Sequence, residues 1–309
     1  MAKKVVRRLF KIIIQLIVLS ICGVFVYNHA EDFSVFFTLP VPHVLTLLSI
    51  SFISLLPVAF EFNYSLQLFN LKLKLKEWFG LSIVNSFYNI FLPFSSGIFI
   101  RGVYLKKKYS FDFSKYSGLM GISLLLNLII GALLALVLAM SVSHSVDLDI
   151  IKLISFGLVG LIVFLLLLYF LSKKLATIDF KISFINTFLA SIESGINLLL
   201  ENKSLILPLI LSQLAMNVLL GIRLFLCFYF LDLEVSFLSV ILVQALTMFT
   251  TIINITPGNI GLREGVIGSL QVLLGVSFEE SVLAATLDRV FSTITVLLLG
   301  LFFNYKLLK

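Results

Sequence analysis

The segment "ITPGNIGLREGVIGSL", residues 255–270, interrupts an otherwise apolar part of the chain with a proline, four glycines, an arginine and a glutamate. Pro257 ends a helix because it has no N–H to donate, and Gly258 and Gly261 allow the chain to turn and to approach a ligand closely. A half-helix that starts after the turn has free N–H groups and a partial positive charge. Arg263 adds a bidentate donor suited to phosphate, so the segment predicts a broken helix that binds an anion.

The composition is that of a membrane protein. Of the 309 residues, 60% are hydrophobic and the mean hydropathy is +1.13, whereas a soluble domain is about 45–50% apolar. Several apolar runs reach about 20 residues, the length at which a helix crosses a bilayer. No hydrophilic block of domain size interrupts them. We therefore predict an all-α polytopic membrane protein with a single membrane domain over residues 1–309.

The charged residues indicate membrane topology rather than nucleic-acid binding. The net charge is +7, and the lysines and arginines gather at the ends of apolar runs, as in cytoplasmic loops. Cys22 and Cys227 both lie inside apolar runs, which predicts neither a disulfide framework nor a metal site. The three histidines lack metal-ligand spacing. We expect no metal, no cofactor, no catalytic residue and no nucleic-acid partner.

About six apolar segments are predicted to span the bilayer. The N-terminal apolar run is long and no small-residue cleavage site follows it, so we expect an uncleaved first helix rather than a signal peptide. Loops without Lys or Arg alternate with basic loops, which predicts that both termini lie in the cytoplasm and that the protein resides in the plasma or inner membrane. The expected spans are residues about 9–27, 44–70, 114–141, 151–171, 205–230 and 282–304.

Two further apolar segments are interrupted and predict re-entrant hairpins. The stretch "WFGLSIVNSFYNIFLPFSSGIFIRGVYLKKK", residues 78–108, is broken at Pro93, follows the basic segment with Lys72, Lys74 and Lys76, and ends in Lys106, Lys107 and Lys108. A segment with two basic ends starts and finishes on the cytoplasmic side. The runs 236–255 and 262–275 flank the turn at Pro257, and the alternation of charge closes only if they form a second hairpin that enters from outside.

Residues about 182–200 predict an amphipathic helix that lies in the membrane interface. Apolar side chains such as Phe188 and Ile192 recur at helical spacing, and polar side chains such as Glu193 and Asn197 occupy the other face. The alternative is a weakly apolar spanning helix, which would reverse the orientation of every later segment.

The hairpins predict two repeats of opposite orientation. Residues about 44–141 and about 205–304 each contain a helix, a broken hairpin and a helix, and the two units start on opposite sides of the membrane. Inverted repeats with discontinuous helices are typical of transporters whose substrate site lies near the bilayer midplane. Each break carries Pro-x-x-x-Gly and an arginine: Pro93, Gly97 and Arg101 in the first repeat, and Pro257, Gly261 and Arg263 in the second.

An arginine inside an apolar segment needs a specific reason, because burying its charge costs at least a few kcal/mol. For Arg263 the alternative to anion binding is that "GLREG" is a small-xxx-small packing motif, although packing does not require an arginine. For Arg101 a purely topological role is about equally good, because the basic cluster Lys106 to Lys108 lies beside it.

Several other ionisable residues lie in apolar runs, and an intramembrane charge is a functional hypothesis with a partner to be named. Glu264 could pair with Arg289, and Asp288 could neutralise Arg289 or Arg263. Structural pairing and direct ligand contact both stay open for this group of residues. Its members are Glu61, Arg223, Glu264, Asp288 and Arg289.

The two breaks resemble a known family. "LPFSSGIFIRGVYLKKK" and "TPGNIGLREGVIG" are similar to segments of the flippase-like membrane domain of the lysylphosphatidylglycerol synthase family, and the resemblance covers nearly the whole chain. The first segment departs from the family pattern, with Phe94 and Ser95 where glycines are usual. The residues of the second segment that match are Pro257, Gly258, Gly261, Arg263, Glu264 and Gly265.

The resemblance implies that the protein handles a phospholipid headgroup, often aminoacyl-phosphatidylglycerol, and moves it between leaflets. Two-domain relatives carry a soluble C-terminal domain that makes the lipid, and because this chain stops at Lys309 we expect a stand-alone member that is not itself an enzyme. We expect the anionic phosphate to be engaged from opposite sides by Arg263 and Arg101. The predicted substrate-binding residues are Arg263, Glu264, Pro257, Gly258, Gly261, Arg101, Gly97, Pro93 and Arg289.

The main prediction is therefore translocation of a phospholipid or lipid-linked headgroup across the cytoplasmic membrane. The alternative is a membrane-embedded component of a lipid aminoacylation or glycosylation enzyme that acts with a separate catalytic protein. A transporter of ions or metabolites is a third hypothesis, but no carboxylate-rich coupling site stands out. A membrane phospholipid is the expected ligand, and a homo-oligomer and a separate lipid-modifying enzyme stay open as partners.

Overall fold

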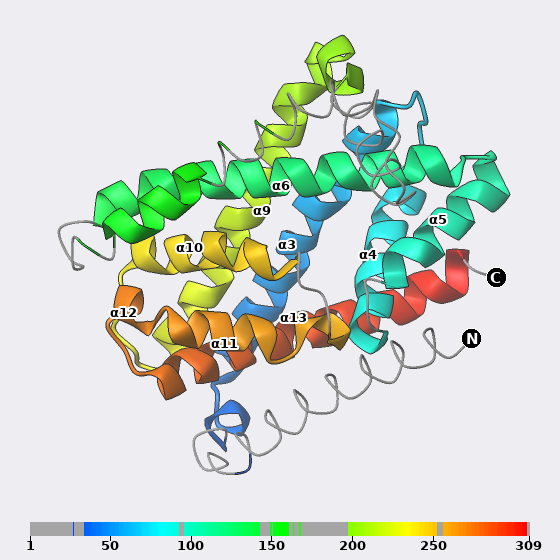
Figure 1. Ribbon diagram of the computed structural model, residues 1–309. Coiled ribbons are helices and arrows are strands. Elements are labelled where there is room, and N and C mark those ends of the chain that lie inside the picture. Colours follow the sequence, from blue (N-terminus) through cyan, green and yellow to red (C-terminus); the bar gives the residue numbers. More distant parts are fainter. Residues whose placement is uncertain are drawn as a thin grey trace, which may run out of the picture.

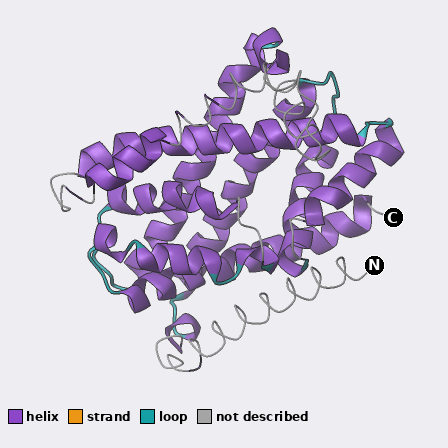
Figure 2. Cartoon of the chain, viewed as in Figure 1, coloured by secondary structure: helices purple, strands orange, loops and turns teal. Residues whose placement is uncertain are grey.

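The computed structural model describes residues 27, 34–92, 96–142, 149, 151–160, 163, 167, 197–251 and 256–307. Over these residues the regular elements are all helices, and none of these residues lies in a strand, as Figures 1 and 2 show. The prediction of an all-α protein is thus confirmed for the described part of the chain.

Among the described residues, four helices are long and apolar enough to cross a membrane. They are α3 (Val41–Gln67), α6 (Phe113–Val142), α9 (Lys203–Phe230) and α13 (Phe278–Leu307). They confirm the helices predicted at about 44–70, 114–141, 205–230 and 282–304, with small shifts at the ends. In the most apolar 18-residue stretch of each helix, at most 44% is buried within the protein. Much apolar surface is therefore left to face lipid.

Other predicted segments fall largely outside the described residues. Of the span predicted at about 9–27 only residue 27 is described, and of the interfacial helix predicted at about 182–200 only residues 197–200 are. In the span predicted at about 151–171, residues Ile151–Gly160 form a helix. Pro93 is also outside the described residues.

Each interrupted segment is built from short helices. The first consists of α4 (Leu75–Phe91) and α5 (Ser96–Tyr109). The second begins with α10 (Phe237–Leu246), which continues into the 3-10 helix η2 (Thr247–Thr251). After residues 252–255 come the 3-10 helix η3 (Pro257–Asn259), α11 (Leu262–Ser269) and α12 (Gln271–Leu274). A further 3-10 helix, η1 (Ser34–Phe37), precedes α3.

The residue before each of the two prolines is extended. Leu92, directly before Pro93, is extended, with φ −114° and ψ 137°. Thr256, directly before Pro257, is also extended, with φ −94° and ψ 153°. A proline ring clashes with the helical conformation of the residue before it. The end of α4 is therefore set locally by the sequence, and the chain enters the second turn in an extended conformation.

The helices of the two halves pack crosswise. We call α3 to α6 the first half and α9 to α13 the second half. Helix α3 packs against α9, α13 packs against α4, and α6 packs against α10. The last helix of each half therefore lies on the interrupted segment of the other half. Figure 1 shows α6 along one side of the molecule, α13 along the opposite side, and α3 and α9 between them.

The larger apolar core surrounds α10. Leu242, Val243 and Ala245 of this helix are fully buried and pack with residues of α6, α9 and α13. A second core in the first half includes Phe62 and Leu105. Because both cores exclude water, a polar side chain placed in them needs a partner within the protein.

Helix α5 begins in very close contact with α4. A Cβ on Gly97 would overlap the carbonyl oxygen of Asn85, so no larger residue fits there without a backbone shift. The N–H of Gly97 donates to Oδ1 of Asn89 at 2.8 Å. This close approach fixes the start of α5 against the last turns of α4.

The other end of α5 is held to the first turn of α4 by Glu77. This carboxylate accepts hydrogen bonds from Tyr104 Oη at 3.0 Å and Tyr109 Oη at 2.6 Å, and it forms an ion pair with Lys108. Burial alone would raise the pKa of Glu77, but the hydrogen bonds, led by that from Lys108, lower it to about 2. The same contact raises the pKa of Lys108. The two ends of the first interrupted segment are thus joined.

Candidate functional site

The turn at Pro257 depends on residues with left-handed backbone. Gly258 has φ +59° and Asn259 has φ +56°, and Gly261, which precedes α11, has φ +81°. Glycine adopts these angles without a steric penalty, and asparagine tolerates them better than most residues. The hydroxyl of Thr256 donates to the carbonyl of Ile260 at 2.9 Å and closes the turn. The break predicted from this stretch is therefore confirmed, with a turn that presents backbone carbonyls.

The start of α11 is capped by its own carboxylate. Oε2 of Glu264 accepts a hydrogen bond from the N–H of Gly261 at 2.9 Å, and Oε1 forms an ion pair with Nε of Arg289. A negative side chain at this position satisfies the partial positive charge of the helix start. Any anion bound nearby must therefore be recognised chiefly by arginine side chains.

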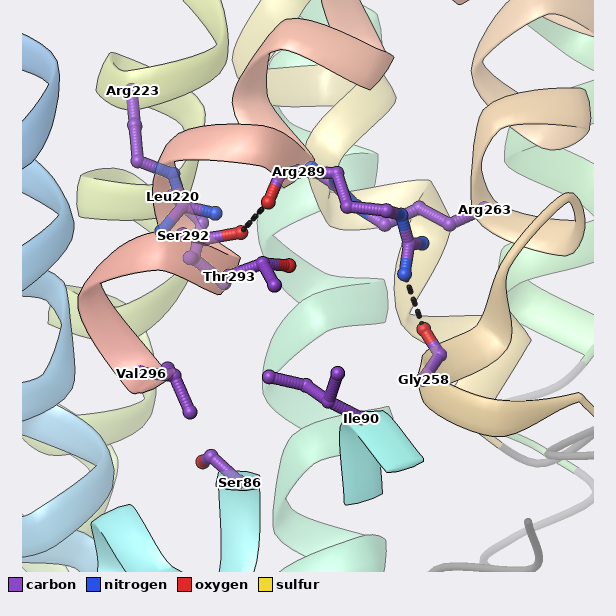
Figure 3. Close-up of a pocket in the computed structure, with 10 residues that line it drawn as sticks. All are labelled: Ser86, Ile90, Leu220, Arg223, Gly258, Arg263, Arg289, Ser292, Thr293 and Val296. Atoms are coloured by element: carbon purple, nitrogen blue, oxygen red, sulfur yellow. Dashed lines mark hydrogen bonds between the residues drawn. The ribbon is translucent and has the colours of Figure 1, made fainter. Parts of the chain in front are cut away.

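Arg289 ties α13 to the turn. Its Nη1 donates to the carbonyl of Gly258 at 2.5 Å, and its Nη2 donates to the carbonyl of Asn259 at 3.3 Å. Together with the ion pair to Glu264, these bonds occupy three of the five N–H groups that an arginine offers. Figure 3 shows the Arg289 side chain reaching the Gly258 carbonyl. Arg289 thus fixes the turn more than it offers free donors.

Asp288, the neighbour of Arg289 on α13, pairs with two arginines. It is fully buried. Its Oδ1 pairs with Nε of Arg223 on α9, and its Oδ2 accepts from Nη2 of Arg223 at 3.0 Å and from Nη1 of Arg263 at 2.7 Å. Arg223 also donates to Ser54 Oγ on α3 at 3.1 Å. Asp288 therefore links α3, α9, α11 and α13 through buried, charge-assisted bonds.

Arg263 is the arginine of this cluster with the most unused donors. Apart from its bond to Asp288, it donates from Nη2 to Oε1 of Gln244 on α10 at 3.0 Å. These two bonds leave three of its five N–H groups without a partner in the described part of the protein. Its side chain is 16% exposed, compared with 7% for Arg223. Arg263 is thus oriented by the protein and still able to donate.

A pocket of about 230 Å³ lies beside these arginines. Figure 3 shows that its wall combines α4, α9, α13 and the turn at Gly258. A Cβ on Gly258 would lie 3.6 Å from Cα of Ile90, so the turn of the second half touches α4 of the first half. The lining residues are Ser86, Ile90, Leu220, Arg223, Gly258, Arg263, Arg289, Ser292, Thr293 and Val296.

The charge at this pocket is positive. Three arginines, Arg223, Arg263 and Arg289, are paired with two carboxylates, Asp288 and Glu264, which leaves a net charge of +1 in this cluster. An uncompensated positive charge in a poorly hydrated site favours an anion, and Arg matches the geometry of phosphate or carboxylate oxygens. Hydroxyls of Ser86, Ser292 and Thr293 add polar groups to the wall.

Arg101, the predicted site residue of the first half, does not line this pocket. It is buried between α3 and α6, with Nε donating to Tyr116 Oη at 2.8 Å and Nη2 to Met120 Sδ at 3.1 Å. Its guanidinium carbon lies 3.9 Å from the ring centre of Phe62. The structure thus brings together Gly258, Arg263 and Arg289, and places Arg101 in a separate cluster.

The remaining predicted residues support this arrangement from outside the pocket. Pro257 starts η3, and Glu264 and Gly261 shape the start of α11. Gly97 packs on α4 and is bonded to Asn89, next to the pocket residue Ile90. Pro93 lies outside the described residues.

Sequence reasoning did not single out Gln244 or Ser54, both of which orient arginines of the cluster. Gln244 carries a signal that was available, since it is a polar residue within the strongly apolar stretch "SVILVQAL". A polar side chain in such surroundings implies a buried partner. Ser54 gave no comparable signal, because serines are common in apolar helices and most bond their own backbone.

Comparison with protein families gives one match, which runs over almost the whole chain. Residues 5–300 match the model of the lysylphosphatidylglycerol synthase TM region. The chain belongs to this family. A search among curated proteins finds no match. Membership and the four apolar helices make the chain a multi-pass membrane protein and connect it with modification or translocation of membrane lipids.

Proposed function

We propose that this member of the lysylphosphatidylglycerol synthase TM region family moves a phospholipid between the leaflets of the plasma or inner membrane. The observation that carries the proposal is the pocket with a net charge of +1, in which Arg263 keeps unused donors. Every phospholipid has a phosphate, and a guanidinium binds phosphate oxygens through paired, charge-assisted hydrogen bonds. The proposed ligand group is therefore the lipid phosphate.

The position of the pocket supports transport rather than simple binding. Its wall includes α4 from the first half and α9, α13 and the η3 turn from the second half, so movement of one half against the other would open and close it. Substrate sites of transporters with repeated halves lie at such junctions. Rocking of the two halves is the mechanism that we propose.

The crosswise packing supports two repeats related by an approximate two-fold axis. If α3 corresponds to α9, α4 to α10 and α6 to α13, exchanging the halves turns the α4–α13 contact into the α10–α6 contact. The same exchange turns the α3–α13 contact into the α9–α6 contact and leaves α3–α9 unchanged. On this proposal α4–α5 and α10–α12 are the two re-entrant hairpins, and both chain termini are cytoplasmic.

Replacement of Arg263 tests the phosphate site. Arg263→Lys keeps a positive charge next to Asp288 but loses the planar fork. A charge-assisted hydrogen bond is worth about 1.5–3 kcal/mol, so we expect Arg263→Lys to lower translocation by about tenfold and Arg263→Ala by up to about a hundredfold. The measurement is movement of a labelled lipid between leaflets of vesicles reconstituted with equal amounts of each folded variant.

Lys203→Ala provides the matched control, because Lys203 is an exposed cation at the start of α9, away from the pocket. We expect it to translocate lipid like the unchanged protein. Full activity of both Arg263 variants would rule out the phosphate site. Translocation by the purified protein alone would also argue against the alternative in which it only serves a separate lipid-modifying catalytic protein.

The family description makes aminoacyl-phosphatidylglycerol the first lipid to test. Its aminoacyl amine is positive while its phosphate is negative, so it could contact Glu264 and Arg263 together. We expect Glu264→Gln to reduce transport of lysyl-phosphatidylglycerol more than that of phosphatidylglycerol in the same vesicles. Equal losses for both lipids would limit Glu264 to its role as the cap of α11 and partner of Arg289.

The proposed orientation can be tested by labelling single cysteines in intact cells. A cysteine at Phe278, at the start of α13, should react with an impermeant reagent from outside, whereas one at Lys107, at the end of α5, should not. External labelling at Lys107 would contradict a hairpin that enters from the cytoplasm.

A further inference from the structure

The first half contains a carboxylate that the proposed lipid site does not use. Glu61 lies within α3, and its Oε1 accepts hydrogen bonds from Ser123 Oγ at 2.5 Å and from Ser65 Oγ at 3.0 Å. Within the described ranges, none of the ion pairs involves Glu61. A carboxylate in apolar surroundings without a cationic partner is stabilised by binding a proton.

Arg101 lies near Glu61 without bonding it. Its guanidinium stacks on Phe62, the neighbour of Glu61 on α3, and donates to Tyr116 and to Met120, which lies one helical turn before Ser123 on α6. Arginine stays charged in proteins. The first half therefore holds a permanent positive charge and a carboxyl group that lie close together without forming a salt bridge.

Within the described residues, the helices around Glu61 add no cation that bonds it. Helix α3 packs against α4, α6, α9 and α13. Helix α6 contributes Ser123, which donates to Glu61, and Tyr116, which accepts a hydrogen bond from Arg101. Of the described residues in α4, α9 and α13, none hydrogen-bonds or ion-pairs with Glu61.

We propose that Glu61 is a proton-binding site that couples lipid movement to a proton gradient, and this coupling rests on the proposed translocation function. With the proton bound, Glu61 is neutral, stays hydrogen-bonded to Ser65 and Ser123, and leaves Arg101 on Phe62 and Tyr116. When the proton leaves, the carboxylate attracts Arg101 and the two form an ion pair. One proton is bound or released in each step, and no other covalent bond changes.

A chain of contacts connects this switch with the lipid pocket. Arg101 lies one helical turn after Gly97, whose N–H is bonded to Asn89 at the end of α4. The adjacent residue, Ile90, lines the pocket and touches Gly258, whose carbonyl is held by Arg289. Movement of Arg101 toward Glu61 would pull α5 and shift this wall of the pocket. Such a route must be tested by measuring how proton binding at Glu61 and lipid transfer affect each other, and an imposed pH gradient allows this measurement.

The first experiment imposes a pH gradient on vesicles that contain the full chain and a labelled phospholipid. For each proton that is coupled to the transfer of one lipid, a gradient of one pH unit changes the steady-state ratio of labelled lipid between the two leaflets about tenfold. We expect the unchanged protein to show this shift and Glu61→Gln to move lipid without any response to the gradient. Glu279→Gln is the control, because Glu279 is an exposed carboxylate in the first turn of α13. A full gradient response in Glu61→Gln would overturn the proposal.

The second experiment detects the proton itself and does not depend on transport. At neutral pH, the infrared spectrum of the purified protein should contain the carbonyl stretch of a protonated carboxylic acid. The band should vanish in Glu61→Gln and persist in Glu279→Gln. Its absence from the unchanged protein would overturn the proton site even if translocation is intact. Conversely, a Glu61 band together with full activity of both Arg263 variants would reject the phosphate site alone.

Discussion

The second half of the protein joins its buried charges into one network, whereas the first half keeps Arg101 and Glu61 apart. In the network, Asp288 is shared by two arginines, and Glu264 links Arg289 to the turn. In the first half, Arg101 rests on an aromatic ring and Glu61 on two hydroxyls. Each set of charges lies in apolar surroundings, but the bonds within it differ.

This difference indicates different roles for the two halves. Charges that are joined by ion pairs are held in one geometry, which suits a site that must present Arg263 to a ligand. Opposite charges that are close but unpaired have a second arrangement available, which suits a switch. Variants that remove single charges or side chains from each half test this difference.

The largest effect is expected from Asp288→Asn. This change removes the negative charge shared by Arg223 and Arg263 and leaves a buried guanidinium group and a partly buried one without that counter-ion. Breaking a buried ion pair by removing one partner costs about 3–5 kcal/mol. We expect a fall of that size in the free energy of unfolding, measured by reversible denaturation in detergent micelles. A loss below about 1 kcal/mol would mean that the network does not stabilise the protein.

Removal of one arginine from each half provides a direct comparison. Arg223→Met takes away one of the two partners of Asp288, so we expect a loss of about 3 kcal/mol or more. Arg101→Met removes a buried charge that has no salt bridge, and an apolar side chain of similar length is often neutral at such a site. We expect a change of less than about 1 kcal/mol, by the same unfolding measurement. Equal losses in the two variants would show that Arg101 already neutralises Glu61.

Replacement of the glycines at the two breaks should destabilise the protein for different reasons. Gly97→Ala places a Cβ against the backbone carbonyl of Asn85, which cannot move aside as a side chain can. Gly261→Ala instead places a side chain on a residue with φ +81°. Overpacking costs about 1–3 kcal/mol and a left-handed non-glycine residue about 1–2 kcal/mol. Gly121→Ala is the control, since nothing lies within 4 Å of its Cβ position; thermal midpoints as low for Gly121→Ala would contradict both explanations.

The smallest effect is expected from Glu77, whose bonds join the two ends of the first interrupted segment. Its pKa is about 2 in the folded protein and about 4.3 in an unfolded chain. A lowered pKa contributes stability that is present above about pH 4.3 and is lost as the pH falls toward 2. The thermal midpoint of the unchanged protein should therefore fall over this range, and that of Glu77→Gln should fall less. Parallel curves would mean that Glu77 does not control acid stability.

Much of the fold follows from local sequence. The helices at about 44–70, 114–141, 205–230 and 282–304 are set by long apolar runs, which must form their hydrogen bonds internally in lipid. The breaks at Pro93 and Pro257 follow from the geometry of proline and of the residue before it. These are properties of neighbouring residues, so they require no knowledge of distant packing.

The composition of the site was only partly determined by sequence. Arg263, Gly258 and Arg289 belong to one pocket, and the pairing of Glu264 with Arg289 was among the predicted alternatives. The sharing of Asp288 between Arg263 and Arg223 joins positions 25 and 65 residues apart. Such pairs depend on which faces of α9, α11 and α13 meet, and helical spacing alone does not specify this.

The sequence by itself determined a membrane protein of apolar helices with two proline breaks and an arginine near each. Only the tertiary structure decided that Arg263 faces the pocket between the two halves while Arg101 is enclosed among Phe62, Tyr116 and Met120. The physical reason is that hydrophobicity and backbone preference act locally. The partner of a buried charge is instead selected by the packing of whole helices, which brings together residues that are distant in the chain.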